Sequence, residues 1–217
     1  RGQFGLVKWD RKLEGKTLHD WAIMKGLKPT PENGAELVME AIQNGGASCI
    51  YHVLSDEDVE RIMKHPLTMT GSDGRLTEPG SGHPHPRWYG AFPRVLGHYV
   101  REKGVLKLED AIRKMTSLPA RRVGLKQRGQ IKSGYYADLV VFDPKKIIDK
   151  ATFTDPHQYP EGIHYVFING TLAIGEGKFL NRRPGQVLRR SHHSHSTVFP
   201  DEKWQKWKTP EAAGWSS

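Results

Sequence analysis

The sequence has little cysteine and no long apolar run. Cys49 is the only cysteine among 217 residues, so no internal disulfide and no cysteine-rich zinc site can form within the chain. No run of about 18 apolar residues is present, and we expect no membrane-spanning helix. A single cysteine is typical of a reducing compartment, and the cytoplasm is the expected location. The chain also begins at Arg1 without a methionine or a leader, which predicts a truncated piece of a longer protein.

Acidic residues are too few to balance the basic ones, and the formal net charge is +9. The segment from Lys178 to Lys208 contains eight Lys and Arg residues but only two acidic residues. Such a segment can attract nucleic acid or anionic lipid. No nucleic-acid-binding motif accompanies it, so nucleic acid is not an expected partner. We interpret residues 181–217 as a basic, poorly ordered tail, whose tryptophans could dock on another surface.

The first half of the chain alternates helical and strand-like patterns. Apolar spacing predicts helices over residues 16–26 and 31–45, and a further helix that starts at Ser55. The apolar run at 47–53 predicts a buried strand, and a second strand is expected at 67–70. This order is typical of an α/β fold with a parallel sheet. Functional residues of such sheets follow the carboxyl ends of the strands, and this predicts that Asp73 lies at such an end.

The second half changes character near Gly124. Helices are expected over residues 92–102 and 108–118. Beyond them, residues 131–144 are rich in strand formers. Two further strand-like runs at 163–174 are joined by Asn169-Gly170, a strong hairpin signal. We therefore divide the chain into residues 1–124, a small β module at 125–180 and the tail at 181–217.

One acidic and one basic residue stand out in the middle of the chain. Asp73 lies on a glycine-flanked bend, Gly71-Ser72-Asp73-Gly74, and Arg87 follows on a loop stiffened by Pro84 and Pro86. A carboxylate can move protons and a guanidinium can hold an anion, so the two could form a site. The residues alone also permit a purely structural role for each side chain. Asp73 could stabilise a turn, and Arg87 could form a surface ion pair.

Several segments together resemble a known family. Residues 71–74, 85–97 and 108–120 are similar to the N-acyl-D-amino-acid deacylase (D-aminoacylase) family of the amidohydrolase superfamily. Residues 134–143 and 166–170 resemble the closing β segment found across that superfamily. The similarity covers roughly residues 10 to 190. The Gly-Ser-Asp-Gly and His-Pro-Arg motifs are more specific to the deacylase branch than the β motifs.

The resemblance implies a fold, an activity and a cofactor. It implies an α/β chain that forms the C-terminal part of a (β/α)8 TIM-barrel metal-dependent hydrolase, followed by part of a small β-sandwich. The implied reaction hydrolyses the linear amide of small-molecule N-acyl-D-amino acids to a carboxylate and a free D-amino acid, with Zn²⁺ as cofactor. The family's His and Cys metal ligands lie upstream, and residues 1–70 contain no matching set. The expected partner is therefore the missing N-terminal portion, and the isolated fragment is expected to be inactive.

The resemblance also implies residue roles. Asp73 matches the catalytic aspartate, which acts as a general base and then a general acid and could touch the metal. A zinc-bound water, with its pKa lowered to about 7, would be the group that it deprotonates. Arg87 matches the arginine that binds the substrate carboxylate through two parallel hydrogen bonds. Ser72 and Gly74 flank Asp73 and are assigned to substrate binding.

Other candidates are interpreted more simply. His83 and His85 have the His-x-His spacing of metal ligands, but Pro84 and Pro86 favour a rigid loop on the substrate side. His52 is interpreted as a buried histidine, with a supporting role near the metal as the alternative. Three further positions are assigned structural roles: His65 as a helix end, Cys49 as a core residue and 191–195, which is histidine-rich, as part of the tail.

Two other functions remain open. The generic β motifs also permit a cyclic-amide hydrolase similar to hydantoinases. A cyclic imide has no free carboxylate for Arg87 to hold, which argues against this alternative. The chain could also be a non-catalytic truncated module whose basic tail binds an acidic partner.

Overall fold

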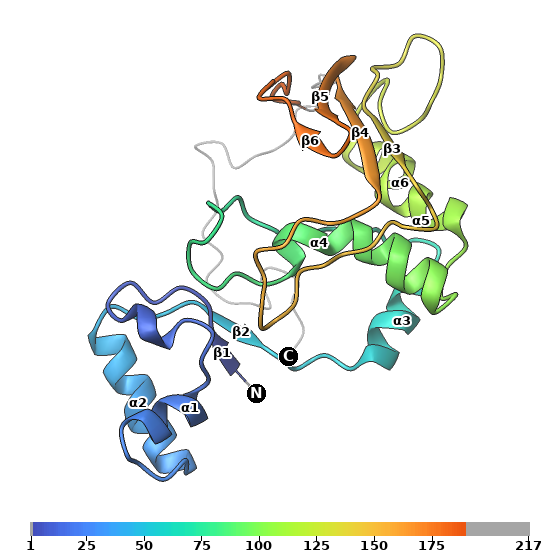
Figure 1. The fold of residues 1–217 in the computed structure, drawn as a ribbon. Helices are drawn as coiled ribbons and strands as arrows, with labels where there is room; N and C mark the ends of the chain where they lie inside the picture. The colour runs from blue at the N-terminus through green and yellow to red at the C-terminus, as the bar shows by residue number, and fades with distance from the viewer. Residues whose placement is uncertain (1, 190–217) are drawn as a thin grey trace, which may run out of the picture. The chain divides into compact units, whose positions relative to one another are not determined.

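The computed structural model describes residues 2–189 (Figure 1). The chain divides into two units, residues 1–187 and 188–217, and every helix and strand given below belongs to the first. The histidine-rich segment 191–195 and the tryptophans at 204, 207 and 215 lie outside the described residues, so the predictions made for them stay predictions. The boundary predicted near residue 125 also stays a prediction. No helix among the described residues is long and apolar enough to cross a membrane.

The chain opens with a small helical and strand module. Its elements are β1 (Gly2–Phe4), the 3-10 turn η1 (Arg11–Leu13), α1 (Leu18–Met24), α2 (Pro31–Gln43) and β2 (Cys49–Tyr51). Both helices begin at a threonine cap: Thr17 forms a capping box with Asp20, and Thr30 precedes Pro31 at the first helical position. The two predicted helices are confirmed. Their apolar faces meet in a core made of Phe4, Val7, Leu13, Trp21, Ala22, Leu37 and Ala41.

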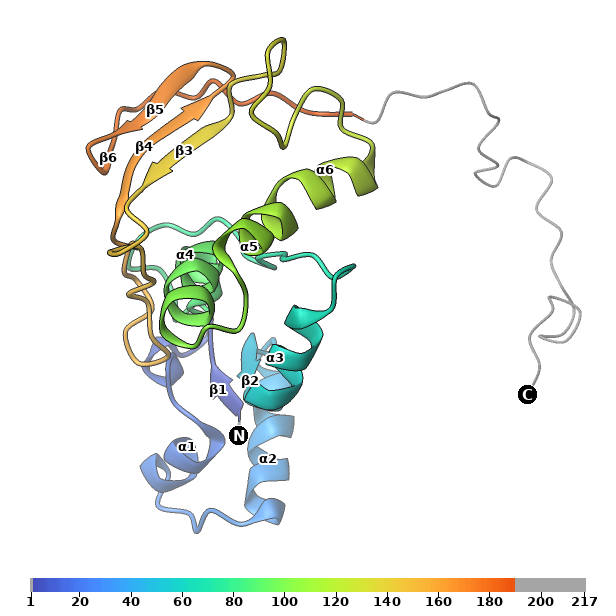
Figure 2. The same ribbon diagram turned by 90° about the vertical axis from the view of Figure 1, so that its right-hand side faces the viewer.

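The predicted parallel sheet is wrong for the described part of the chain. β2 pairs antiparallel with β1 in a two-stranded sheet, in which Gly2 lies opposite Tyr51 (Figure 2). Such a sheet buries alternate side chains, so Ile50 is buried while Cys49 is exposed. The prediction of Cys49 as a core residue is therefore also wrong. Residues 67–70 form no strand, because contacts with a later helix hold this segment in place of a β ladder.

The middle of the chain is helical. Its elements are α3 (Asp56–Lys64), α4 (Arg87–Arg94), the π-helical continuation η2 (Val95–Glu102), α5 (Leu108–Met115) and α6 (Ser117–Val123). Ser55 caps α3 and His65 ends it, as predicted. Helix α4 begins five residues before the expected Phe92. The single helix expected over 108–118 is broken at Thr116, and α6 accommodates Pro119 in its first turn, where no N–H is needed.

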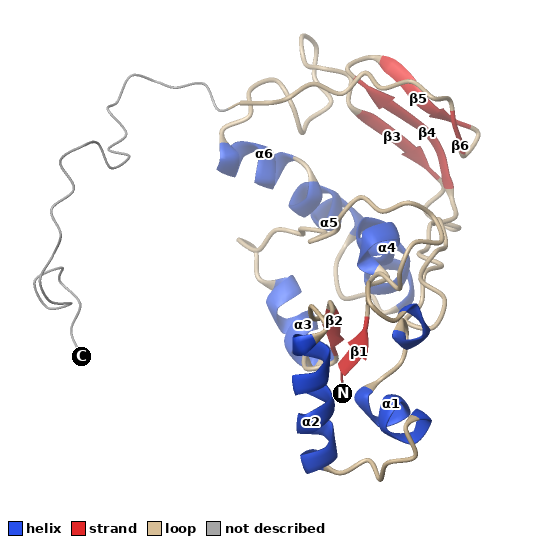
Figure 3. Ribbon diagram, turned by 90° about the vertical axis from the view of Figure 1, so that its left-hand side faces the viewer, coloured by secondary structure: helices blue, strands red, loops and turns tan. Residues whose placement is uncertain are grey.

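The last elements form one antiparallel sheet of order β3-β4-β5-β6 (Figure 3). Its strands are β3 (Leu139–Phe142), β4 (Ile163–Ile168), β5 (Thr171–Gly175) and β6 (Lys178–Phe179). Asn169 and Gly170 both adopt positive φ, at 49° and 78°, which confirms the predicted hairpin. A second core joins the η2 and α5 helices to the segment that follows β3, with Val95, Leu96, Leu106, Ala111 and Ile147 buried.

Candidate functional site

The Asp73 loop has a specific backbone shape. Asp73 adopts a φ of 45°, in the left-handed region that Asp and Asn enter more readily than most residues. The Ser72 hydroxyl accepts a hydrogen bond from the Gly74 N–H at 3.2 Å and closes the turn. Gly74 lies close to the start of α4, since a Cβ atom there would be 3.3 Å from the Trp88 Cα. Asp73 therefore lies on a tight loop and not at the end of a strand, which corrects the expected position.

The structure brings Asp73 and Arg87 together. Arg87 is the first residue of α4, and its Nη2 lies 2.6 Å from Asp73 Oδ2. Its Nε also donates to the Asp73 backbone carbonyl at 3.2 Å. The two side chains are 41% and 86% exposed, so the ion pair is worth at most about 1 kcal/mol. Both groups are accessible. Because the ion pair is weak, an anion that binds Arg87 more tightly could displace the Asp73 carboxylate with little loss of free energy.

His85 supports the start of α4. Its Nδ1 accepts a hydrogen bond from the Arg87 N–H at 3.0 Å, one of the unpaired donors at the helix N-terminus. Burial lowers the pKa of His85 to about 4, and the positive charges of Arg87 and His52 add to this, while Asp73 opposes it. The ring is therefore neutral near pH 7 and can accept this bond. Pro86, at the cap position, has no side chain that could do so.

Phe153 contacts three histidines near this site. Its ring contacts His52 at 4.5 Å and His85 at 5.1 Å between ring centroids, both edge-on. Its backbone carbonyl accepts from His83 Nε2 at 2.6 Å and from Gln3 Nε2 at 3.0 Å. His52 is exposed, so its interpretation as a buried histidine is wrong.

A second contact fixes the loop before α4. His157 Nδ1 lies 2.9 Å from the Tyr89 hydroxyl and accepts from the Gly80 N–H at 3.3 Å. Its Nε2 lies 3.0 Å from the carbonyl oxygen of Gly82. One imidazole thus joins α4 to the loop that precedes it. Neither His157 nor Phe153 was found from the sequence, because no motif marks residues that act only through distant contacts.

The residues present do not complete a metal site. Within residues 2–189, no group of three or more His, Cys, Asp and Glu side chains could hold a metal ion. His83 and His85 point their ring nitrogens at Phe153 and Arg87, and not at one another. Asp73 is the one candidate ligand beside Arg87, and its exposed carboxylate is free to bind a metal from one side. A complete metal centre would need ligands from outside the described residues.

The chain belongs to the amidohydrolase family, whose model matches residues 16–174. The matched range includes the Asp73 loop, α4 and the hairpin of β4 and β5. This match, together with a solved D-aminoacylase that is 41% identical with a TM-score of 0.77 over 88% of this chain and 38% of that one, supports an α/β amidohydrolase-type domain.

Similar proteins of known activity narrow the comparison to one group of amidohydrolases. The chain is 49% identical over 193 residues to an N-acyl-D-aspartate deacylase and 43% identical over 199 residues to a D-aminoacylase, both from Alcaligenes xylosoxydans xylosoxydans. These matches cover 84% and 86% of this chain but only 38% and 40% of the relatives. A solved N-acyl-D-glutamate deacylase from Bordetella bronchiseptica, in complex with zinc and a phosphonate inhibitor, has a TM-score of 0.73 at 37% identity. That match covers 87% of this chain and 37% of the solved one.

Proposed function

We propose that this chain is the C-terminal part of a zinc-dependent amidohydrolase that hydrolyses N-acyl-D-amino acids. In this proposal the helices complete a (β/α)8 barrel and strands β3 to β6 belong to a small β-sandwich. The observation that carries the proposal is the placement of an accessible carboxylate, Asp73, against an accessible guanidinium, Arg87. The names of the relatives supply the substrate class.

Asp73 has the chemistry of a proton shuttle. Its carboxylate accepts a proton from the attacking water as the water oxygen bonds to the amide carbon. It then donates that proton to the nitrogen as the carbon–nitrogen bond breaks, so that an amine leaves and a carboxylate remains. The exposure of Asp73 leaves this carboxylate open to a reacting molecule.

Arg87 has the chemistry of a carboxylate clamp. Every N-acyl amino acid carries a free carboxylate, and a guanidinium binds such a group through two parallel hydrogen bonds. Arg87 holds Asp73 through an ion pair with its carboxylate and a hydrogen bond to its backbone carbonyl, and a substrate carboxylate would take the place of the ion pair. Ser72 and Gly74 shape the loop beside it and define the edge of the proposed substrate site.

The proposed cofactor is zinc, which the solved N-acyl-D-glutamate deacylase contains. Asp73 would supply one ligand, and the other ligands would come from outside residues 2–189. An N-terminal portion like that of the longer relatives is thus the proposed partner of this chain. The cyclic-amide alternative is not favoured, because the relatives are a D-aminoacylase and an N-acyl-D-aspartate deacylase.

The test uses a fusion of this chain to the N-terminal portion of the D-aminoacylase relative. Hydrolysis of N-acetyl-D-methionine and N-acetyl-D-aspartate is measured, with hydantoin as the comparison substrate. Asp73→Asn should lower kcat by about 10²- to 10⁴-fold. Arg87→Ala should raise KM by about 10- to 100-fold, because a charged hydrogen-bonding partner is lost.

Arg75→Ala is the matched control, since Arg75 is an exposed arginine on the same loop. It should leave both constants unchanged. Full activity of Asp73→Asn would contradict the catalytic role, and an unchanged KM for Arg87→Ala would contradict the clamp. A folded fusion that hydrolyses none of the substrates would favour a non-catalytic module.

A further inference from the structure

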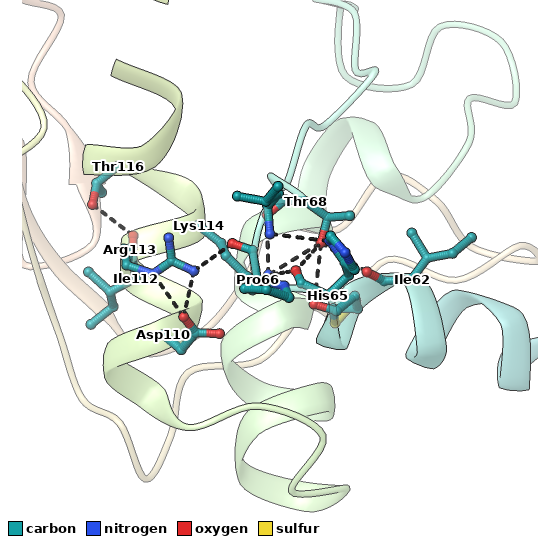
Figure 4. Close-up of polar contacts among 11 residues, drawn as sticks. Ile62, His65, Pro66, Thr68, Asp110, Ile112, Arg113, Lys114 and Thr116 are labelled. Carbon is teal, nitrogen blue, oxygen red and sulfur yellow. Dashed lines mark hydrogen bonds and ion pairs between the residues drawn. The ribbon is translucent and has the colours of Figure 1, made fainter. Parts of the chain in front are cut away.

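Lys114 is a fully buried lysine on α5, with only 1% of its surface exposed. Its ammonium donates to the carbonyl of His65, to the Thr68 carbonyl at 3.2 Å and to the Thr68 hydroxyl at 3.3 Å (Figure 4). An ammonium has three donor hydrogens, and three acceptors surround it. Lysine is almost never fully buried, so this side chain is an unusual feature of the molecule.

The partners of Lys114 are dipoles and not a carboxylate. Within the described part of the chain, no acidic side chain forms an ion pair with it, and Asp110 pairs with Arg113 instead. His65 ends α3, so the ammonium lies where the helix dipole is negative. Burial lowers the pKa of Lys114, and Asp110 partly opposes this. A methionine would fill the same space without the cost of burying a charge, so packing alone does not require a lysine here.

The contacts of Lys114 all fall on one segment, residues 65–70. Its side chain holds the start and middle of the segment. Its backbone carbonyl accepts from the Thr70 N–H at 3.1 Å and so holds the end. The neighbouring Arg113 donates to the carbonyl of Pro66 at 2.9 Å (Figure 4). Two successive residues of α5 therefore fix a segment that has no regular secondary structure.

This segment leads directly into the Asp73 loop. Thr70 is the last residue that α5 holds, and Gly71, Ser72 and Asp73 follow it. The loop is attached on its other side by Arg87, through a weak exposed ion pair. The buried contacts of Lys114 are therefore the firm support on the N-terminal side of Asp73.

We propose that Lys114 is a positioning residue of the catalytic site, which fixes residues 65–70 as the base from which the Asp73 loop projects. Its importance for catalysis rests on the function proposed above for Asp73. Lys114 touches no reacting group and acts only through this segment. Arg87 is placed separately, by α4 and His85, so the two halves of the site have independent supports.

The first experiment is hydrogen exchange on the chain as it stands, and it needs no activity. Lys114→Met should speed the exchange of the backbone amides of residues 67–74 by about tenfold or more. The amides of α2 should not change. Lys107→Met is the matched control, because Lys107 is an exposed lysine just before the same helix.

A second variant covers the case in which Lys114→Met does not fold. Thr68→Val keeps the side-chain shape but removes one acceptor of the ammonium and the donor to His65 and Ile62. It should speed exchange over the same residues by a smaller factor. Unchanged exchange over residues 67–74 in a folded Lys114→Met chain, or in Thr68→Val if only that variant folds, would overturn the proposal.

The second experiment measures turnover in the fusion described above. Lys114→Met should lower kcat by up to about 10²-fold, the effect of a misplaced catalytic group, while KM changes less than about threefold. A merely structural role would lower the amount of folded enzyme and leave kcat per folded molecule unchanged, and that result would overturn the positioning role. If the unmodified fusion is inactive, the proposed function fails while the exchange experiment still decides whether Lys114 holds the segment.

Discussion

At the scale of single residues, His85 makes the stability of the fold depend on pH. Its folded pKa is about 4, below the value of about 6.5 for a free histidine. Between these values the unfolded chain binds more protons than the folded one, so the stability of the fold rises with pH. This contribution is fully present above pH 6.5 and is lost as the pH falls towards 4. Arg87 and His52 favour the neutral ring, and Asp73 opposes them.

His85→Asn should remove this pH dependence and keep the hydrogen bond, because the Asn side-chain oxygen can accept the Arg87 N–H as Nδ1 does. Urea unfolding at pH 7 and pH 5 measures the effect. The unmodified chain should lose more stability between the two pH values than the variant. Equal losses in both chains would show that His85 is not the group that titrates.

Single residues also show which parts of a site a sequence can reveal. Asp73 and Arg87 were predicted because their motifs are local and their side chains carry charge. Phe153 was not predicted, since it meets His83 across seventy residues of sequence and has no motif of its own. His52 was interpreted wrongly because the predicted buried strand over 47–53 contains it, whereas β2 ends at Tyr51 and His52 is exposed.

At the scale of elements, the α4–η2 helix packs against the segment after β3 through two glycines. A Cβ atom on Gly90 would lie 2.5 Å from the Asp149 Cβ. One on Gly97 would lie 2.5 Å from the Ile147 carbonyl oxygen. Both added Cβ atoms would meet the same segment, residues 147–149, so the side of the helix that carries the two glycines admits this segment at close range.

Gly97→Ala should destabilise the chain by about 1–3 kcal/mol, because the obstructing atoms include the Ile147 carbonyl oxygen and the Ile148 Cα, backbone atoms that cannot move aside. Chemical denaturation followed by circular dichroism measures the change. Gly34→Ala is the matched control: Gly34 lies within α2 and an added Cβ meets nothing within 4 Å. It should stabilise the chain by up to about 1 kcal/mol. Equal effects of the two substitutions would contradict the close packing.

Whether a helix or strand was predicted correctly depends on whether its stabilising contacts are local in the sequence. Helices α1, α2 and α3 were predicted because their caps and apolar faces are local signals. The strand expected at 67–70 was wrong, since backbone groups of Pro66, Thr68 and Thr70 bind Arg113 and Lys114 of a distant helix. The break at Thr116 was also missed: one helix was expected over 108–118, but α5 ends at Met115 and α6 begins at Ser117.

At the scale of the whole molecule, the described chain leaves many large apolar side chains in water. One group lies at the end of β2 or just after it, and another flanks the Asp73 loop; they include Tyr51, Val53, Leu54, Leu67 and Leu76, all at least 70% exposed. Burying such a side chain contributes about 1.5–3 kcal/mol. The relatives are longer, and this chain covers only 38–40% of them. We therefore expect the N-terminal portion of such a protein to cover this surface.

The expected result is that this chain binds the separately produced N-terminal portion of the D-aminoacylase relative, and that zinc is retained only by the mixture. Calorimetry and metal analysis after gel filtration measure both.

The double substitution Val53→Asp and Leu54→Asp should abolish association, because it places two charges where apolar contact is expected. Ile131→Asp is the control, a charge on an equally exposed side chain outside this surface, and should leave association unchanged. Stoichiometric zinc in this chain alone would contradict the expectation that ligands from the N-terminal portion are needed. Association that survives the double substitution would place the contact elsewhere.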